Sequence, residues 1–274
     1  MWGMTDQEAR YDRIAEGYAT WWSPVHRTAT LGVLDEVGDG LAAGARRLLD
    51  VGCGTGALAV AAARRWPSLL VDGVDASDGM LAIARRELDG QPPVRDRVTY
   101  TRADADRLPF DDGTFDVVVS AFVLQLVPSR PRALREMRRV LRPGGRLAFV
   151  TWLRADASLA ADAAYDDALT AAGLEPREPG GGHDDIASPA AALAQLRRAG
   201  LRGVTARADR LEHDFTPEGF IGFITRFDDE DLFRTMDPAD RARLEQDLLR
   251  RLRALPPGGL RLVLPIVYAT GRRG

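Results

Sequence analysis

Residues 48–56, Leu-Leu-Asp-Val-Gly-Cys-Gly-Thr-Gly, constrain the fold of this chain more than any other stretch. The apolar run predicts a buried strand, the three alternate glycines predict a tight loop, and residues 57–66 predict a helix. Glycines let backbone amides approach a ligand without an obstructing Cβ, and the helix directs its unpaired N–H groups to the same place. We therefore expect this loop to bind a ligand that carries a negative group.

The segments after this loop alternate between predicted strands and predicted helices. The expected strands are 47–51, 69–75, 98–102, 115–120 and 146–152, and the expected helices are 57–66, 77–88 and 130–141. Such alternation is typical of a parallel sheet with helices on both faces, in which ligands bind at the carboxyl ends of the strands. We therefore expect the functional residues directly after each strand.

Two later segments, 201–215 and 260–270, are also strand-like, and a mainly helical, charged stretch separates them. They could form a hairpin that closes one edge of the sheet, with the helical inserts above the strand ends as a lid. The predicted fold class is α/β: a Rossmann-like, mostly parallel seven-stranded sheet with helices on both faces, an antiparallel last strand and helical lid insertions.

We expect one domain over residues 1–274, because we see no repeats and no clear second domain. Its expected parts are an N-terminal helical cap at 1–42, a cofactor-binding core at 43–152, and lid or substrate insertions at 153–200 and 214–258.

Aromatic residues gather in the first predicted helix. This helix is expected to run to about Trp22, because Pro24 breaks it. Four aromatic residues lie within twelve positions: Tyr11, Tyr18, Trp21 and Trp22. An amphipathic helix that buries its rings on the domain would explain this cluster, and so would a cap whose rings close over a ligand. Both interpretations stay open. A second helix is expected at 27–42.

The composition points to a cytoplasmic enzyme. The formal net charge is −3, and a general nucleic-acid binder concentrates positive charge, so we expect no nucleic-acid partner. The single cysteine, Cys53, excludes an intrachain disulfide and a multi-cysteine zinc site, and we expect no metal. No apolar run reaches the roughly 18 residues of a membrane span, and the N-terminus does not resemble a signal peptide. We therefore expect no membrane partner, and the oligomeric state stays open.

Two classes of nucleotide cofactor fit the glycine loop. Gly52, Gly54 and Ala57 match the dinucleotide pattern G-x-G-x-x-G/A, and Asp75 could hold ribose hydroxyls. A nicotinamide cofactor would place a pyrophosphate on the helix, whereas S-adenosylmethionine would place a carboxylate there. Asp50 would repel a pyrophosphate but suits a ligand with ammonium and sulfonium charges. The chain also has no lysine to complete a Tyr–Lys proton donor for hydride transfer.

Six motifs occur in a characteristic order. They are YDRIA from residue 11, LDVGCGTG at 49–56, VDASDGML at 74–81, ADADRLPF at 103–110, FDVVVS at 115–120 and LRPGGR at 141–146. In this order and spacing the chain resembles the class I S-adenosylmethionine-dependent methyltransferases, particularly the small-molecule group related to ubiquinone and menaquinone biosynthesis. The resemblance covers roughly residues 11–152.

The resemblance implies S-adenosylmethionine as the cofactor. Together with the charge argument for Asp50, it gives a set of predicted contacts to this cofactor. The implied cofactor residues are Tyr11, Tyr18, Asp50, Gly52, Gly54, Thr55, Gly56, Asp75, Ala76, Met80, Asp104, Ala105, Ala121 and Phe122. The glycines would line the methionyl part and Asp75 would take the ribose hydroxyls. Asp104 and the backbone of Ala105 would read the adenine edge. Many relatives have His where this chain has Gln125, which cannot act as a base at neutral pH.

Methyl transfer from a sulfonium is an in-line displacement for which a protein mainly supplies alignment and a dry site. A base is needed only if the nucleophile must lose a proton, and the candidates are His26, His183 and His213, together with carboxylates in the lid. A hypothetical aromatic wall indicates an aromatic or apolar small-molecule substrate. The residues of this wall are Trp21, Trp22, Gln125, Trp152, Phe223 and Phe227.

The predicted function is methyl transfer to an O, N or C nucleophile of a small molecule. A non-methylating member of the fold, either a cyclase-like catalyst or a binding scaffold, is the main alternative. A nucleic-acid methyltransferase is disfavoured because the Pro-Pro-aromatic signature of amino-directed enzymes is absent at 120–123 and the only cysteine lies in the glycine loop. A nicotinamide-dependent oxidoreductase is the remaining rival.

Overall fold

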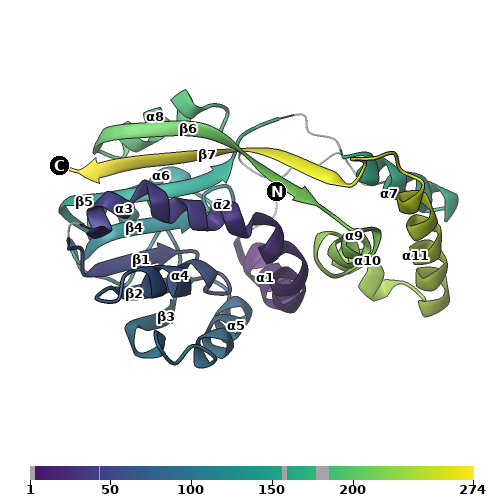
Figure 1. Cartoon of the computed structure of the whole chain (residues 1–274), viewed down its shortest axis with the longest axis horizontal. Helices are drawn as coiled ribbons and strands as arrows, with labels where there is room; N and C mark the ends of the chain where they lie inside the picture. Colours follow the sequence, from purple (N-terminus) through teal and green to yellow (C-terminus); the bar gives the residue numbers. More distant parts are fainter. Residues whose placement is uncertain (1–3, 43, 156–158, 177–184) are drawn as a thin grey trace.

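The computed structural model of the chain describes residues 4–42, 44–155, 159–176 and 185–274. Its centre is a seven-stranded sheet in the order β3-β2-β1-β4-β5-β7-β6 (Figure 1). The strands are β1 (Arg47–Val51), β2 (Leu70–Asp75), β3 (Val98–Arg102), β4 (Phe115–Ala121), β5 (Leu141–Trp152), β6 (Leu201–Asp214) and β7 (Arg261–Arg273). Strands β1 to β5 run parallel, and β7 lies antiparallel between β5 and β6. The predicted α/β fold class is confirmed.

Helices cover both faces of this sheet. The α-helices are α1 (Met4–Gly17), α2 (Ser23–Glu36), α3 (Gly38–Ala42), α4 (Ala57–Arg65), α5 (Asp78–Asp89), α6 (Arg130–Val140), α7 (Ala160–Ala171), α8 (Pro189–Arg198), α9 (Pro217–Phe223), α10 (Glu230–Thr235) and α11 (Pro238–Arg253). Two π-helical turns, η1 (Tyr18–Trp22) and η3 (Ile224–Asp228), and a 3₁₀ turn, η2 (Arg95–Arg97), complete the order.

Alternate residues of the strands bury opposite faces of the sheet, as the two-residue repeat of a strand requires. In β1, Leu48 packs in the hydrophobic cluster that includes α2 and α4, whereas Leu49 packs in the cluster that includes α6 and α8. Both leucines are fully buried. Because apolar side chains fill both faces, the central strands appear in the sequence as continuous apolar runs.

The helices α7, α9, α10 and α11 form an outer helical group at the far end of the β6–β7 hairpin (Figure 1). Helix α1 lies between this group and the sheet, where it contacts α5 and η3. Residues of α1, of the outer group and of the carboxyl ends of the strands line one cavity. The topology therefore brings the first and last thirds of the chain to the edge where ligands bind in such sheets.

The connection from α1 to α2 differs from the expected break at Pro24. The chain stays helical throughout, and the N–H of Ser23 bonds to the carbonyl of Tyr18 in the wider π-helical turn. A new α-helix begins at Ser23, and Pro24 lies in its first turn, where its missing N–H costs nothing. The strand expected at 146–152 also starts earlier, at Leu141.

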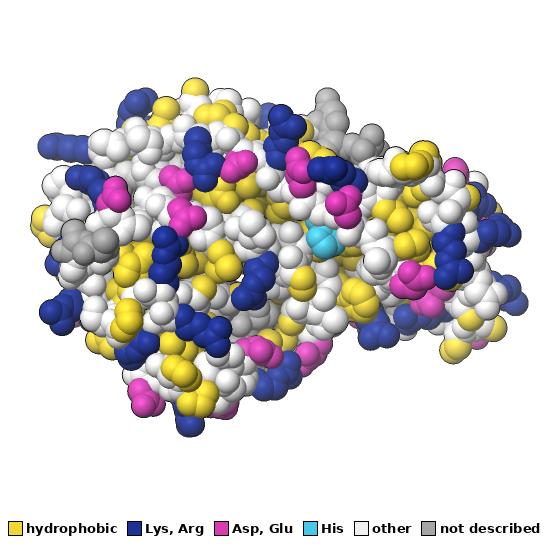
Figure 2. Space-filling model, viewed as in Figure 1, with side chains coloured by type: hydrophobic (Ala, Val, Ile, Leu, Met, Phe, Trp, Pro, Cys, Tyr) yellow, Lys and Arg dark blue, Asp and Glu magenta, His cyan; other side chains and the backbone are white. Residues whose placement is uncertain are grey.

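Basic and acidic side chains are interspersed over the face of the molecule in Figure 2, and the basic ones are all arginine. Within the described ranges, no helix combines the length and the apolar character needed to cross a bilayer.

Asp116, near the start of β4, joins three parts of the sheet. Its Oδ2 accepts hydrogen bonds from the N–H groups of Arg46 and Arg47 at 2.6 and 2.8 Å, and its Oδ1 lies 2.5 Å from the Arg142 guanidinium. We expect Asp116→Ala to lower the free energy of unfolding by about 2–3 kcal/mol, because it leaves two backbone donors without an acceptor. Asp116→Asn keeps an acceptor oxygen and should cost less. Urea denaturation measures both, and equal losses would contradict this role.

Candidate functional site

The glycine loop joins β1 to α4 and is anchored on the end of β2. The N–H groups of Gly52 and Cys53 both donate to the Val74 carbonyl, at 2.7 and 2.9 Å. Gly52 has a φ of +71°, and a Cβ at this position would collide with the Val123 side chain. A Cβ at Gly54 would meet no atom within 4 Å. Gly52 is therefore required by packing, whereas Gly54 leaves the cavity side of the loop open.

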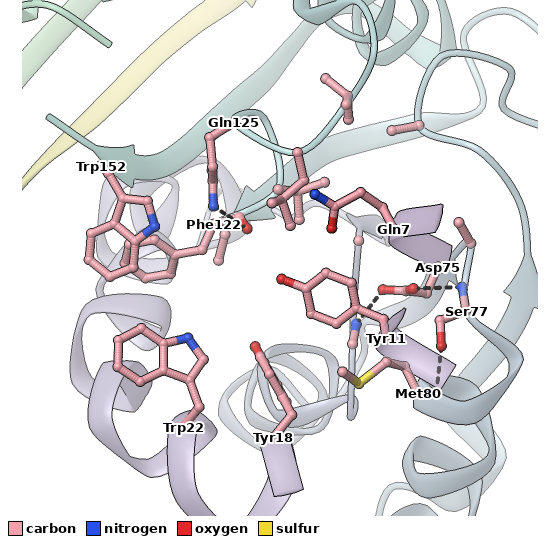
Figure 3. Close-up of a pocket in the computed structure, with 18 of the residues that line it drawn as sticks. Gln7, Tyr11, Tyr18, Trp22, Asp75, Ser77, Met80, Phe122, Gln125 and Trp152 are labelled. Carbon is pink, nitrogen blue, oxygen red and sulfur yellow. Dashed lines mark hydrogen bonds between the residues drawn. The ribbon is translucent and has the colours of Figure 1, made fainter. Parts of the chain in front are cut away.

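Asp75, the last residue of β2, holds this loop in place. Its Oδ2 accepts a hydrogen bond from the Gly54 N–H at 2.8 Å, and its Oδ1 accepts one from the Ser77 N–H at 3.0 Å (Figure 3). Burial raises the pKa of the carboxyl, and the backbone bonds from Ser77 and Gly54 oppose the shift. Asp75 also borders the cavity, where its remaining lone pairs can accept hydrogen bonds from a ligand.

A cavity of about 390 Å³ lies at this edge of the sheet. It collects most of the residues that the sequence predicts as cofactor contacts: Tyr11, Tyr18, Gly52, Gly54, Asp75, Ala76, Met80, Asp104, Ala105, Ala121 and Phe122. They come from α1, η1, the glycine loop and the segments that follow β2, β3 and β4. The fold therefore gathers residues from separate segments of the chain around one space.

Three predicted cofactor residues do not border this cavity. Asp50 and Thr55 line a separate space of about 30 Å³ behind the glycine loop. Gly56 borders a hollow on the other side of the loop, and its missing Cβ makes room for the Tyr100 hydroxyl.

Asp50 is a buried carboxyl behind the glycine loop. It is 1% exposed, and its Oδ2 has no hydrogen-bond partner. Burial, followed by the charge of Asp75, raises the pKa of Asp50 to about 8, and a backbone hydrogen bond from Ala59 opposes this shift. An ionised Asp50 would be stabilised by a cation near the loop.

Aromatic side chains form the other half of the cavity. The lining residues there include Trp22, Gln125, Trp152, Phe223 and Phe227. The rings of Phe122 and Trp152 lie 4.2 Å apart, and those of Trp22 and Phe227 stack at 5.5 Å (Figure 3 shows the first three rings). The structure does not bring Trp21 to this wall, because its ring packs on Gly222 of α9.

A strained backbone turn after β4 positions the aromatic wall of the cavity. Phe122 has a φ of +55°, a left-handed conformation that costs a bulky residue about 1–3 kcal/mol. Gln125 Nε2 donates to the Phe122 carbonyl at 2.7 Å, and the Thr151 hydroxyl donates to Gln125 Oε1 at 2.7 Å. Both ends of the Gln125 amide are therefore engaged, and this side chain supports the turn while it borders the cavity.

The three histidines have different positions. His26 borders the cavity, and it contacts the Tyr18 hydroxyl and Thr30 Oγ1. His213 lies on β6, where its ring packs edge-on against Phe215, and it does not line the cavity. His183 lies outside the described residues. Within the described part of the chain, no three His, Cys, Asp or Glu side chains could together hold a metal ion.

Sequence reasoning missed part of the α1 face that closes the cavity. Gln7 and Arg10 line it beside Tyr11, and Arg10 donates to the Phe227 carbonyl at 3.1 Å. Gln7, Tyr11 and Tyr18 follow a helical spacing of about four and seven residues, which places them on one face. This spacing could have indicated Gln7, but the contact between Arg10 and η3 depends on the tertiary fold.

We expect Asp50→Asn to stabilise the ligand-free protein at alkaline pH. The folded-state pKa of about 8 lies above the ordinary value of 3.8, so the folded state retains a proton that the unfolded state releases. The free energy of unfolding of the wild type then falls as the pH rises from 3.8 to about 8, by up to about 1.4 kcal/mol per pH unit. Melting temperatures of both proteins from about pH 5 to pH 9 test this linkage. A difference between them that does not change with pH would contradict it.

Part of this chain is similar to a family of known proteins. Residues 49–149 match a family described as a methyltransferase domain. The demethylmenaquinone methyltransferase of Symbiobacterium thermophilum is 39% identical over 145 residues, which are 50% of this chain and 55% of that protein. The 27-O-demethylrifamycin SV methyltransferase of Amycolatopsis mediterranei is 37% identical over 162 residues, 58% of this chain and 55% of that protein. The chain thus spans about half the length of the curated relatives it matches.

The fold is shared more widely than the sequence. The (4+2)-cyclase SpnF matches this structure with a TM-score of 0.60 over 98% of this chain and 96% of that protein, at 21% identity. The sequence match of residues 49–149 includes the glycine loop, Asp75 and the turn after β4, which form half of the cavity. Over this segment, the chain is similar to the methyltransferase-domain family.

Proposed function

We propose that this chain transfers a methyl group from S-adenosylmethionine to a small molecule with a planar, apolar body. One observation carries the proposal: a single cavity joins the glycine loop and Asp75 to a wall of aromatic rings. The family match supports it, as do the relatives that are named as methyltransferases of small molecules.

The residues of the loop half fit this cofactor. Asp75 offers carboxylate lone pairs to the ribose hydroxyls, and Gly54 leaves room for the amino-acid part. The unpaired oxygen of Asp50 lies behind the same loop, so the positive charges of the cofactor would stabilise its ionised form. Met80 and Asp104 would enclose the adenine.

The bound cofactor would supply a methyl group activated by its sulfonium. The protein's own residues would align the reactants and exclude water, and such alignment contributes on the order of 7–11 kcal/mol. Tyr11 and Tyr18 cover the cavity from the N-terminal helices, and the aromatic half closes the other side. The reaction disperses the sulfonium charge, so this wall needs no fixed charge to stabilise the product.

The lining also disfavours an anionic acceptor. Six carboxylates and one guanidinium border the cavity: Glu8, Asp75, Asp104, Asp106, Asp185 and Asp228, with Arg10. Arginines outside the lining pair with some of these carboxylates, but the charges nearest to a ligand remain mainly negative. We therefore propose an acceptor that carries no anionic group.

The remaining parts of the chain fit the same proposal. Residues 1–42 would act as a cap, 43–152 as the cofactor-binding core, and 153–200 and 214–258 as lid insertions of a single domain. The net charge of −3 and the mixed charges on the face in Figure 2 favour a diffusible acceptor over nucleic acid or a membrane surface. We propose the cytoplasm as the location of this activity.

We expect Asp75→Ala to weaken the binding of S-adenosylhomocysteine, the demethylated cofactor, at least about tenfold. The variant removes charge-assisted hydrogen bonds to the ribose and releases the Gly54 amide. Asp72→Asn is the matched control, since Asp72 lies on the same strand but pairs with Arg47 away from the cavity. Isothermal titration calorimetry measures both variants. Tighter binding of NAD than of S-adenosylmethionine to the wild type would overturn the proposed function.

Incubation with methyl-labelled S-adenosylmethionine and a metabolite extract separates the proposal from its nearest rival. Label in a small molecule supports methyl transfer. Cofactor binding without any transfer of label would favour the non-methylating alternative, a cyclase-like catalyst or a binding scaffold.

A further inference from the structure

A chain of hydrogen bonds runs from the cavity into the protein through Tyr18, His26 and Thr30. The Tyr18 hydroxyl lies 2.9 Å from His26 Nε2, and His26 Nδ1 lies 2.9 Å from Thr30 Oγ1. His26 and Thr30 are only 5% and 9% exposed. The packing around the imidazole is aromatic, with the rings of Trp22 and Phe122 at 5.7 and 5.2 Å.

The chemistry of the three groups assigns the direction of these bonds. A phenol donates better than it accepts, because its oxygen lone pair is delocalised into the ring, whereas the unprotonated nitrogen of imidazole is a good acceptor. Burial lowers the pKa of His26 to about 4, so the ring is neutral at pH 7. The Tyr18 hydroxyl therefore donates to Nε2, and the Nδ1–H of His26 donates to Thr30 Oγ1.

This direction leaves the Tyr18 oxygen with only lone pairs for a ligand. The Tyr18 side chain borders both the main cavity and the small space behind the glycine loop. Its ring lies between Tyr11 and Phe227, and its oxygen points to the open centre of the pocket (Figure 3). The Tyr18 oxygen therefore lies at the boundary between the loop half and the aromatic half of the cavity. A transferred methyl group has to cross this boundary.

Resting on the proposed function, we infer that the methyl acceptor is a hydroxyl group on a planar, apolar molecule. Tyr18 is the catalytic residue that accepts the hydrogen bond of this hydroxyl. His26 is a positioning residue that orients Tyr18 and takes up the relayed proton.

Methyl transfer and proton relay form one step. The acceptor oxygen forms a bond to the methyl carbon, and the S–CH₃ bond breaks with its electron pair going to sulfur. The hydroxyl proton moves to the Tyr18 oxygen as the Tyr18 proton moves to His26 Nε2. The resulting imidazolium is held by Thr30 and returns its proton to water after the ether product leaves.

The proton relay through Tyr18 and His26 favours a hydroxyl acceptor over an amine. A neutral amine attacks through its free lone pair and can release its proton later in water. A methylated hydroxyl that kept its proton would be an oxonium, a far stronger acid than an imidazolium, so even a weakly basic buried histidine can accept that proton. A proton acceptor beside the methyl path is thus needed by a hydroxyl acceptor and not by an amine.

The test uses 2-naphthol and 2-methoxynaphthalene, which share a ring system but differ in the O–H donor. Calorimetry with S-adenosylhomocysteine present should show at least about tenfold tighter binding of 2-naphthol to the wild type. Tyr18→Phe and His26→Leu should abolish this preference. His26→Gln should restore part of it, because its amide oxygen can accept from Tyr18. Tyr100→Phe, outside the cavity, is the matched control and should keep the full preference.

Three outcomes would overturn the inference while the proposed function stands. In the first, the wild type binds S-adenosylhomocysteine but does not prefer 2-naphthol. In the second, Tyr18→Phe keeps the full preference. In the third, His26→Gln and His26→Leu change the preference equally. Failure of the wild type to bind S-adenosylhomocysteine would instead remove the proposed function. Methyl-labelled cofactor adds a kinetic readout: labelling of 2-naphthol in a single turnover should slow at least about tenfold in Tyr18→Phe.

Discussion

The carboxylate of Asp75 connects the parts of the molecule that form the cavity. It accepts hydrogen bonds from the glycine loop and from Ser77, which caps α5. The Ser77 hydroxyl donates in turn to Asp12 of α1, and Asp12 also accepts from the Gly79 N–H. One strand end thus positions the loop, the next helix and the N-terminal helix together. Because these bonds converge on two carboxylates, the cavity has its shape before any ligand arrives.

The same region contains two energetically unfavourable features of the fold. Asp50 is buried with an unpaired oxygen, and Phe122 occupies a left-handed backbone conformation that Gln125 holds. Phe122 borders the main cavity, and Asp50 lines the small space behind the glycine loop. Backbone strain and an unsatisfied buried carboxyl oxygen close to one cavity are typical of sites where stability is given up for function. The apolar clusters on both faces of the sheet supply the rigidity that maintains them.

Local patterns predicted most of the fold and, together with the family resemblance, most residues that line the loop half of the cavity. The apolar run and glycines of residues 47–56 gave the bounds of β1 correctly. Asp75 and Asp104 were named because they lie at or just after the end of a strand, and Phe122 was named from the family resemblance. The aromatic half depends on tertiary packing, and periodicity alone could not separate Trp21 from Trp22. The π-helical turn aligns Tyr18, Trp22 and His26 on the cavity side, and no pattern of residue types announces such a turn.

The central claim is that the glycine-loop half holds the nucleoside and the aromatic half holds the acceptor. A crystal structure of the chain with S-adenosylhomocysteine tests it most directly. The account predicts a ribose whose hydroxyls bond to Asp75, an amino-acid part beside Gly54, and a sulfur directed toward Tyr18 and Phe122. An unoccupied loop, or an adenine lodged among the aromatic rings, would contradict it.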